Sequence, residues 1–138
     1  MIHADLHLDN MIFDPPRDPR PVIVLDWQTV SVGPPASDLI FFLSDSLAVE
    51  ERRAAETALL ERYLAQLGAH GVQDYSIEQL RTDCGRALLL LLAGSIGWVT
   101  TVTGDDLTAR ERALQEKAVS GGRLTAALLD YGALDLIG

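Results

Sequence analysis

Three oxygen-bearing side chains near the start of the chain have the types and spacing of a site for a divalent cation and a hydroxyl group. Asp5 and Asn10 share one polar loop, and Asp26 ends a short apolar run further along. Mg²⁺ prefers oxygen ligands and takes only one or two of them from the protein. Asn10 and Asp26 would supply two ligands with a single negative charge, while Asp5 stays free to orient a hydroxyl and accept its proton. This is the chemistry of phosphoryl transfer.

The elements that must position these side chains are two short β-prone runs at residues 11–13 and 22–25. The stretch between them, residues 14–21, is dense in proline and aspartate, which are turn formers. Two such runs around a turn predict a β-hairpin. A hairpin brings its outer ends together, so Asn10 and Asp26 should lie side by side, with Asp5 on the loop leading in.

These motifs resemble a known family. The segment HADLHLDN, residues 3–10, resembles the H-G-D-x-x-x-x-N catalytic loop of the aminoglycoside phosphotransferase and choline kinase-like superfamily, which has a protein-kinase-like fold. LDWQ, residues 25–28, resembles its second metal motif, and GPPASDL, residues 33–39, resembles its G-x-P-x-x-D-L segment. One departure is Ala4, at a position where glycine is common.

The resemblance implies a role for five residues. Asp5 resembles the catalytic base, and Asn10 and Asp26 resemble the Mg²⁺ ligands through which ATP is bound. His3 resembles the histidine that braces the loop. Asp38, at the start of a helix, resembles a buried aspartate that accepts hydrogen bonds from the backbone of the catalytic loop.

A metal-dependent hydrolase that uses His3, Asp5 and His7 is a remote alternative. Catalytic zinc needs at least three protein ligands, and His70 is the one further histidine of the chain. His7 and Asp9 occupy positions that vary in the family, so we assign them no chemistry.

The rest of the chain has helical spacing. The predicted fold class is mostly α (α+β): one hairpin followed by four to five helices, the C-terminal lobe of a kinase-like fold. We expect a single domain over 1–138, with the catalytic loop and metal-binding hairpin in 1–32 and a helical subdomain in 33–138. Ser37 is the predicted N-cap of the first helix, and Ser76 with Gln79 forms a capping box. The predicted helices cover approximately residues 37–47, 49–67, 76–102 and 108–131.

Two features of these helices have simple structural interpretations. The second helix carries a charged face, which we interpret as solvated; its residues are Glu51, Arg52, Arg53 and Glu56. Cys84 precedes a strongly apolar helical run and is expected in the core rather than as a nucleophile.

Composition narrows the choice of partner and compartment. The chain has 138 residues and a formal net charge of −9, which argues against nucleic acid or an anionic membrane as partner. The single cysteine allows no internal disulfide. No signal peptide or spanning segment is visible, so we expect a cytoplasmic protein.

A complete kinase also needs a glycine-rich loop and a strand lysine over the nucleotide. The chain has one lysine, Lys117, in a predicted helix, and no G-x-G-x-x-G. We therefore expect that the nucleotide-covering N-terminal lobe is absent, that the chain is truncated, and that it is weakly active or inactive alone. The expected partners are a small-molecule hydroxyl acceptor and the missing lobe. A non-catalytic binding or structural remnant is the alternative.

Overall fold

The computed structural model describes residues 1–14, 21–101 and 107–137, and the side chains of these ranges outside 97–118. Within them the chain is mostly helical, with one two-stranded antiparallel hairpin and four α-helices, which confirms the predicted fold class. The strands are β1 (Met11–Phe13) and β2 (Val22–Val24). The helices are α1 (Ala36–Ser46), α2 (Val49–Ala69), α3 (Ile77–Thr101) and α4 (Leu107–Asp130), and the short 3-10 turns are η1 (Leu8–Asn10), η2 (Trp27–Thr29) and η3 (Ala133–Ile137).

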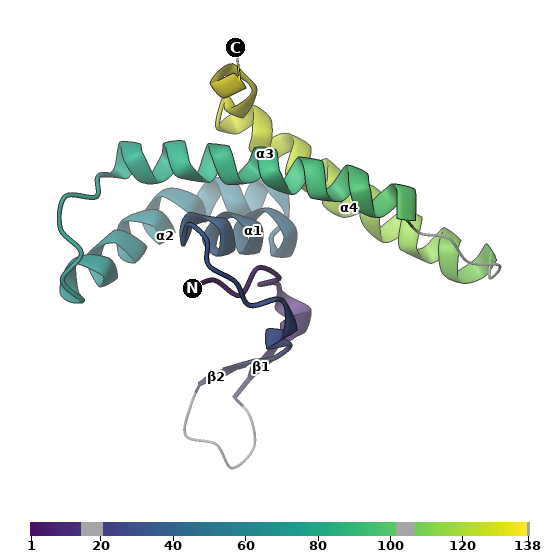
Figure 1. The fold of residues 1–138 in the computed structure, drawn as a ribbon, viewed down its shortest axis with the longest axis horizontal. Coiled ribbons are helices and arrows are strands. Elements are labelled where there is room, and N and C mark those ends of the chain that lie inside the picture. The colour runs from purple at the N-terminus through teal and green to yellow at the C-terminus, as the bar shows by residue number, and fades with distance from the viewer. Residues whose placement is uncertain (15–20, 102–106, 138) are drawn as a thin grey trace.

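The hairpin projects from one side of the helices (Figure 1). Met11 pairs with Val24 and Phe13 with Val22. Beyond the strands the pairing continues on the side of the site, where the Leu25 N–H donates to the Asn10 carbonyl at 2.8 Å. The proline-rich turn itself falls largely on residues 15–20, which lie outside the described residues, as does the side chain of Lys117.

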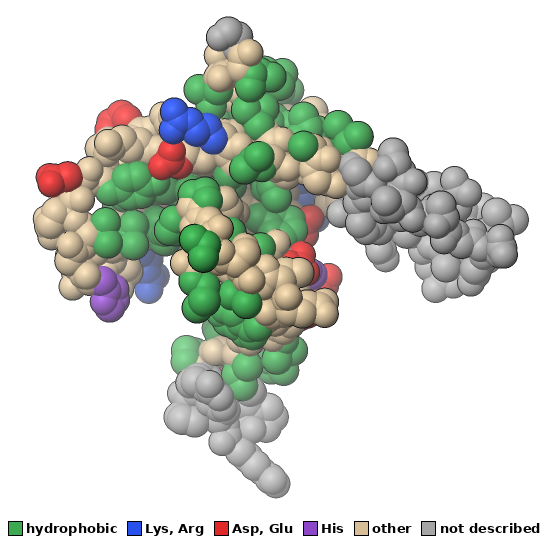
Figure 2. All heavy atoms as spheres, in the orientation of Figure 1, with side chains coloured by type: hydrophobic (Ala, Val, Ile, Leu, Met, Phe, Trp, Pro, Cys, Tyr) green, Lys and Arg blue, Asp and Glu red, His purple; other side chains and the backbone are tan. Residues whose placement is uncertain are grey.

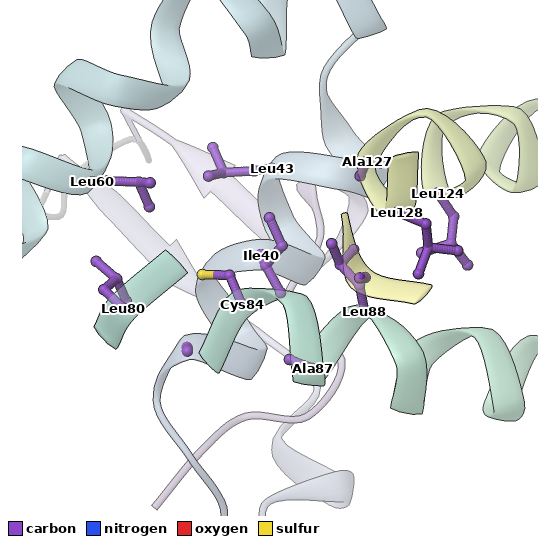
Figure 3. Close-up of a cluster of buried hydrophobic side chains, with 12 residues drawn as sticks. Ile40, Leu43, Leu60, Leu80, Cys84, Ala87, Leu88, Leu124, Ala127 and Leu128 are labelled. Atoms are coloured by element: carbon purple, nitrogen blue, oxygen red, sulfur yellow. The ribbon is translucent and has the colours of Figure 1, made fainter. Parts of the chain in front are cut away.

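The core forms where α1 packs between α3 and the other helices (Figure 3). Its buried side chains are apolar and come from all four helices, so each helix buries one stripe, as helical spacing predicts. The largest are Ile40, Leu43, Leu60, Leu80, Leu88, Leu124 and Leu128. No helix in the described ranges combines the length and apolar character needed to cross a bilayer.

The predicted N-terminal capping is confirmed for α3 but is wrong for α1. At the start of α3 the Gln79 N–H donates to Ser76 Oγ at 3.2 Å, and the Ser76 N–H donates to Gln79 Oε1 at 2.7 Å. The predicted capping box is therefore confirmed. Ser37 is not the N-cap of α1: the helix begins one residue earlier, after Pro35. Pro35 is the N-cap instead, and its φ of −58° and ψ of −27° already have helical values, so α1 starts before the serine.

The charged face of α2 is not fully solvated, which corrects our interpretation of it. Arg52 is 1% exposed and Glu56 is 7% exposed. The Arg52 guanidinium donates to Glu56 on the next turn of α2 and to Asp130 at the end of α4. Arg53 binds the same Asp130 carboxylate with two hydrogen bonds, at 2.8 and 3.0 Å. The end of α4 lies against this face, so part of it is an interhelical ion cluster.

The hairpin and its flanks expose apolar side chains. Phe13 is 55% exposed, Trp27 is 51% and Val32 is 97%. Figure 2 shows hydrophobic side chains at the surface in the part of the molecule between the helices and the hairpin loop. The solvent-facing surface of the hairpin and its flanks therefore carries several apolar side chains.

Candidate functional site

The first turn of α1 holds the loop at the start of the chain. Asp38 accepts hydrogen bonds from the His3 N–H at 2.7 Å and from the Ala4 N–H at 2.9 Å, one to each carboxylate oxygen. These are the backbone donors that the sequence predicts for Asp38. The residue is half-buried, whereas the sequence predicts a buried aspartate, and this corrects that expectation. Hydrogen bonds to an ionised acceptor are stronger than neutral ones, so Asp38 fixes the loop on the helix.

His3 sits between the loop and the end of β2. It is 2% exposed, and its Nε2 donates to the Leu25 carbonyl at 2.7 Å, while its Nδ1 accepts from the Asp5 N–H at 3.3 Å. A carbonyl can only accept and an amide N–H can only donate, so His3 is the neutral Nε2–H tautomer. The ring also meets Trp27 edge-on, with centroids 4.8 Å apart. Both ring nitrogens are used, which leaves none for a metal and disfavours the hydrolase alternative.

Two residues at the site have left-handed backbone conformations. Ala4 has φ of 66° and Asp26 has φ of 58°. A non-glycine residue costs about 1–2 kcal/mol in this region, although aspartate visits it more easily than alanine. The conformation explains why glycine is common at the position of Ala4 in the motif that this segment resembles. Such strain persists where surrounding contacts impose it, and here the hydrogen bond from Ala4 to Asp38 does so.

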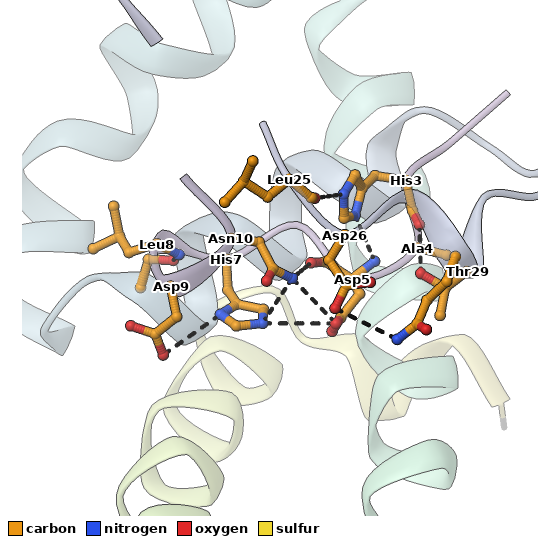
Figure 4. A network of polar contacts seen from close by, with 12 residues as sticks. His3, Ala4, Asp5, His7, Leu8, Asp9, Asn10, Leu25, Asp26 and Thr29 are labelled. Atoms are coloured by element: carbon orange, nitrogen blue, oxygen red, sulfur yellow. Dashed lines mark hydrogen bonds and ion pairs between the residues drawn. The ribbon is translucent and has the colours of Figure 1, made fainter. Parts of the chain in front are cut away.

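The three predicted residues lie on segments that meet at the open end of the hairpin, and two of them, Asp5 and Asn10, are in contact. The Asn10 amide Nδ2 donates to the Asp5 carbonyl at 2.9 Å and to Asp5 Oδ2 at 3.2 Å. Asp26 follows Leu25, whose N–H donates to the Asn10 carbonyl. The hydrogen bonds from Asn10 to Asp5 are drawn in Figure 4. Asp26 is exposed, and its contact with Gln28 Nε2 is long, at 3.4 Å. Its carboxylate is thus accessible from solvent.

The donor set suits a hard cation with few protein ligands. Because the Asn10 amide nitrogen is turned toward Asp5, its Oδ1 is the end left for a cation, and Asp26 adds a carboxylate. Oxygen ligands in this small number are what Mg²⁺ takes from proteins. Among the described residues there is no group of three or more His, Cys, Asp or Glu placed to hold a metal, as a zinc site would need.

Sequence reasoning missed two hydroxyl contacts and one histidine. The Thr29 hydroxyl donates to the His3 carbonyl at 2.9 Å, and Ser46 Oγ accepts from the Leu8 N–H at 3.2 Å. These contacts join segments far apart in sequence, and no local pattern marks them. His7 was given no chemistry, yet its Nε2 lies 3.1 Å from the Asn10 amide nitrogen. Its place three residues before Asn10, across a 3-10 turn, is the signal that could have found it.

Cys84 is part of the core, as the sequence predicts. Its side chain is fully buried, and burial raises the pKa of the thiol to about 12. The thiolate is the nucleophilic form of cysteine, so Cys84 contributes packing and not reactivity.

The loop bound to the first turn of α1, followed by a hairpin that ends in a carboxylate, agrees with the kinase-like class that the sequence motifs resemble. The model of the ecdysteroid kinase-like family matches residues 1–73, more than half of the chain. The chain therefore belongs to this family. The match includes the loop of residues 3–10, the hairpin, α1 and α2.

Curated relatives match over a short stretch. A segment of 42 residues is 48% identical to acyl-CoA dehydrogenase family member 11 of Pongo abelii and 45% identical to the Homo sapiens protein of the same name. The segment makes up 30% of this chain and 5% of each relative, so only a small part of those proteins is covered. No solved structure matches the chain significantly.

Proposed function

We propose that this chain is the catalytic lobe of an ATP-dependent phosphotransferase that moves the γ-phosphate to a hydroxyl group of a small molecule. The observation that carries the proposal is the contact of Asn10 with Asp5 in a chain of the ecdysteroid kinase-like family, with Asp26 directly after Leu25, whose N–H donates to the Asn10 carbonyl. Phosphoryl transfer requires two things from this lobe: a carboxylate that can accept the hydroxyl proton, and two oxygen ligands for Mg²⁺.

Each residue of the trio has a role that its surroundings support. Asp5 is the base: its side chain is 39% exposed, so a substrate hydroxyl can reach it, and its backbone is held by His3 and Asn10. Asn10 and Asp26 hold Mg²⁺, which when bound offsets the charge of the phosphate oxygens. His3 and Asp38 are structural supports that keep Asp5 in place.

The 138 residues alone should turn over slowly or not at all. In this proposal residues 1–32 form the catalytic loop and hairpin, and residues 33–138 form the helical subdomain. No glycine-rich loop or strand lysine to cover the nucleotide occurs in this sequence. Catalysis of phosphoryl transfer depends on positioning and on a closed, water-poor site, and here the nucleotide would be held from one side.

The test is an ATP-consumption assay with a panel of hydroxylated small molecules, run on this chain and on the longest product of its gene. We expect acceptor-dependent turnover from a product that adds a nucleotide-covering lobe, and turnover far below about 1 s⁻¹ from the 138 residues. In the longer product, Asp5→Asn should lower kcat by about 10²–10⁴-fold, while nucleotide affinity stays close to that of the unchanged protein. Asp14→Asn, an exposed aspartate at the hairpin turn, is the matched control.

Two results would overturn parts of this proposal. Fast acceptor-dependent turnover by the 138 residues, abolished by Asp5→Asn, would show that this lobe suffices. Nucleotide binding without any turnover in the longest gene product would instead establish the alternative, a binding or structural remnant of such a kinase.

A further inference from the structure

The Asn10 side chain has three acceptors around its amide nitrogen (Figure 4). Asp5 provides its carbonyl at 2.9 Å and its Oδ2 at 3.2 Å, and His7 provides Nε2 at 3.1 Å. An amide nitrogen carries two hydrogens and no free lone pair. The nitrogen end of Asn10 therefore lies in a pocket of acceptors, with one contributed by a histidine outside the predicted trio.

The contact sets the tautomer of His7. Because the Asn10 nitrogen can only donate, His7 Nε2 accepts this hydrogen bond only in the tautomer that carries the ring proton on Nδ1. His7 Nδ1 then faces the Asp9 carboxylate, 3.7 Å away. This is the opposite tautomer to His3, whose Nε2 carries the proton. The two histidines of one loop are thus held in different states by their neighbours.

Packing holds the His7 ring in this position. Its side chain is 23% exposed, and the ring meets Phe41 of α1 edge-on, with centroids 6.2 Å apart and planes at 63°. The ring is therefore fixed by the helix that also binds the loop through Asp38. A rigid acceptor is worth more for orientation than a mobile one, because less side-chain freedom is lost when the hydrogen bond forms.

We propose that His7 is a positioning residue that fixes which end of the Asn10 amide faces the metal. If the amide flipped, its oxygen would meet the Asp5 carbonyl and Asp5 Oδ2, both acceptors, and His7 could avoid a third repulsion only by moving its ring proton from Nδ1 to Nε2. The unflipped state leaves Oδ1 for a cation. The inference rests on the proposed function, since it concerns the same metal ligands, and it gives a role to a residue that had none.

The first test compares Mn²⁺ binding by this chain and two His7 variants, measured by electron paramagnetic resonance. His7→Phe keeps an aromatic ring against Phe41 but has no acceptor, and should weaken binding by about 10–100-fold, the usual effect of losing a residue that orients a metal ligand. His7→Gln restores an acceptor that can reach Asn10 and should bind Mn²⁺ close to the unchanged chain. Circular dichroism checks that all three proteins fold.

The second test is the ¹⁵N NMR signature of the His7 ring, which reports its tautomer without any metal. The Nδ1–H form is expected, and an Nε2–H form would overturn the inference. Equal Mn²⁺ affinity in all three proteins would also overturn it while leaving the metal site intact. If the unchanged chain binds no Mn²⁺, the assignment of Asn10 and Asp26 as ligands fails, and the role of His7 fails with it.

Discussion

The helices and the N-terminal region of residues 1–32 are held together by different interactions. The helices share an apolar core and a buried ion cluster around Arg52. Among the described residues of 1–32, His3 is the one buried residue. The loop is held because its backbone N–H groups donate to Asp38 and His3, and its His3 carbonyl accepts from the Thr29 hydroxyl. The packed helices therefore provide most of the stability, and the polar contacts set the positions of the loop residues. Changes in the two regions should therefore differ in kind.

The largest effect on stability should come from the ion cluster. Arg52→Met would leave the buried Glu56 carboxylate without its hydrogen-bonded partner, while Asp130 keeps Arg53. Removing one member of a buried ion pair costs about 3–5 kcal/mol. Arg53→Met is the matched control, because its side chain is 53% exposed and an exposed pair contributes about 0–1 kcal/mol. Urea denaturation measures both. Equal losses in the two variants would contradict the importance of burial.

A change in the loop should act locally. Asp38→Ala removes the acceptor of the His3 and Ala4 N–H groups, and hydrogen bonds to a charged group contribute about 1.5–3 kcal/mol. Hydrogen exchange should show faster exchange at these two amides, while the amides of the helical core keep their protection. Asp45→Ala, on the same helix, is the control. Loss of protection throughout the core would mean that the loop and helices unfold as one unit.

Replacing the strained Ala4 should raise the free energy of unfolding, by a smaller amount than the losses above. Ala4→Gly relieves a left-handed conformation that costs about 1–2 kcal/mol, and glycine returns about 0.5–1 kcal/mol of that through its greater freedom when unfolded. The net gain in the free energy of unfolding should be about 0.5–1 kcal/mol. Ala54→Gly, in the exposed interior of α2, should instead cost about 1 kcal/mol. Thermal denaturation would show whether the two signs differ.

The smallest effect should be on the pH dependence of the stability that the ion cluster contributes. Hydrogen bonds from Arg53 and then Arg52 lower the pKa of Asp130 below its ordinary value of 3.8. A lowered pKa means that the contribution of Asp130 is present above its ordinary pKa and is lost as the pH falls through the lower, folded value. Asp130→Asn should remove this part of the acid dependence of stability, measured by denaturation between neutral pH and about pH 3. An unchanged acid slope would contradict the coupling.

Local patterns predicted most of the fold because they depend on local chemistry. Apolar spacing located the four helices, and Ser76 with Gln79 marked the start of α3. The proline-rich turn located the hairpin. The motif placed Asp38 against the backbone of the catalytic loop, since a carboxylate in the first turn of a helix needs donors. Each of these features is specified within a few residues.

The errors and omissions concern contacts between distant elements. Helical spacing shows that Arg52 and Glu56 lie on the charged face of α2, but it cannot show that the end of α4 covers that face. The burial of Asp38 was also overestimated. His7 was missed because its contact with Asn10 depends on the fold of the loop and on the packing of its ring against α1.

The most direct test of the central claim is the location of a bound metal ion. Mn²⁺ added to ¹⁵N-labelled chain should broaden the NMR signals of Asn10 and Asp26 first. Asp26→Asn should abolish this effect, whereas Asp14→Asn should not; both aspartates have left-handed backbone conformations, which asparagine tolerates. Broadening centred on other acidic residues, or unchanged by Asp26→Asn, would contradict the assignment of this loop and hairpin as a metal-dependent phosphoryl-transfer site.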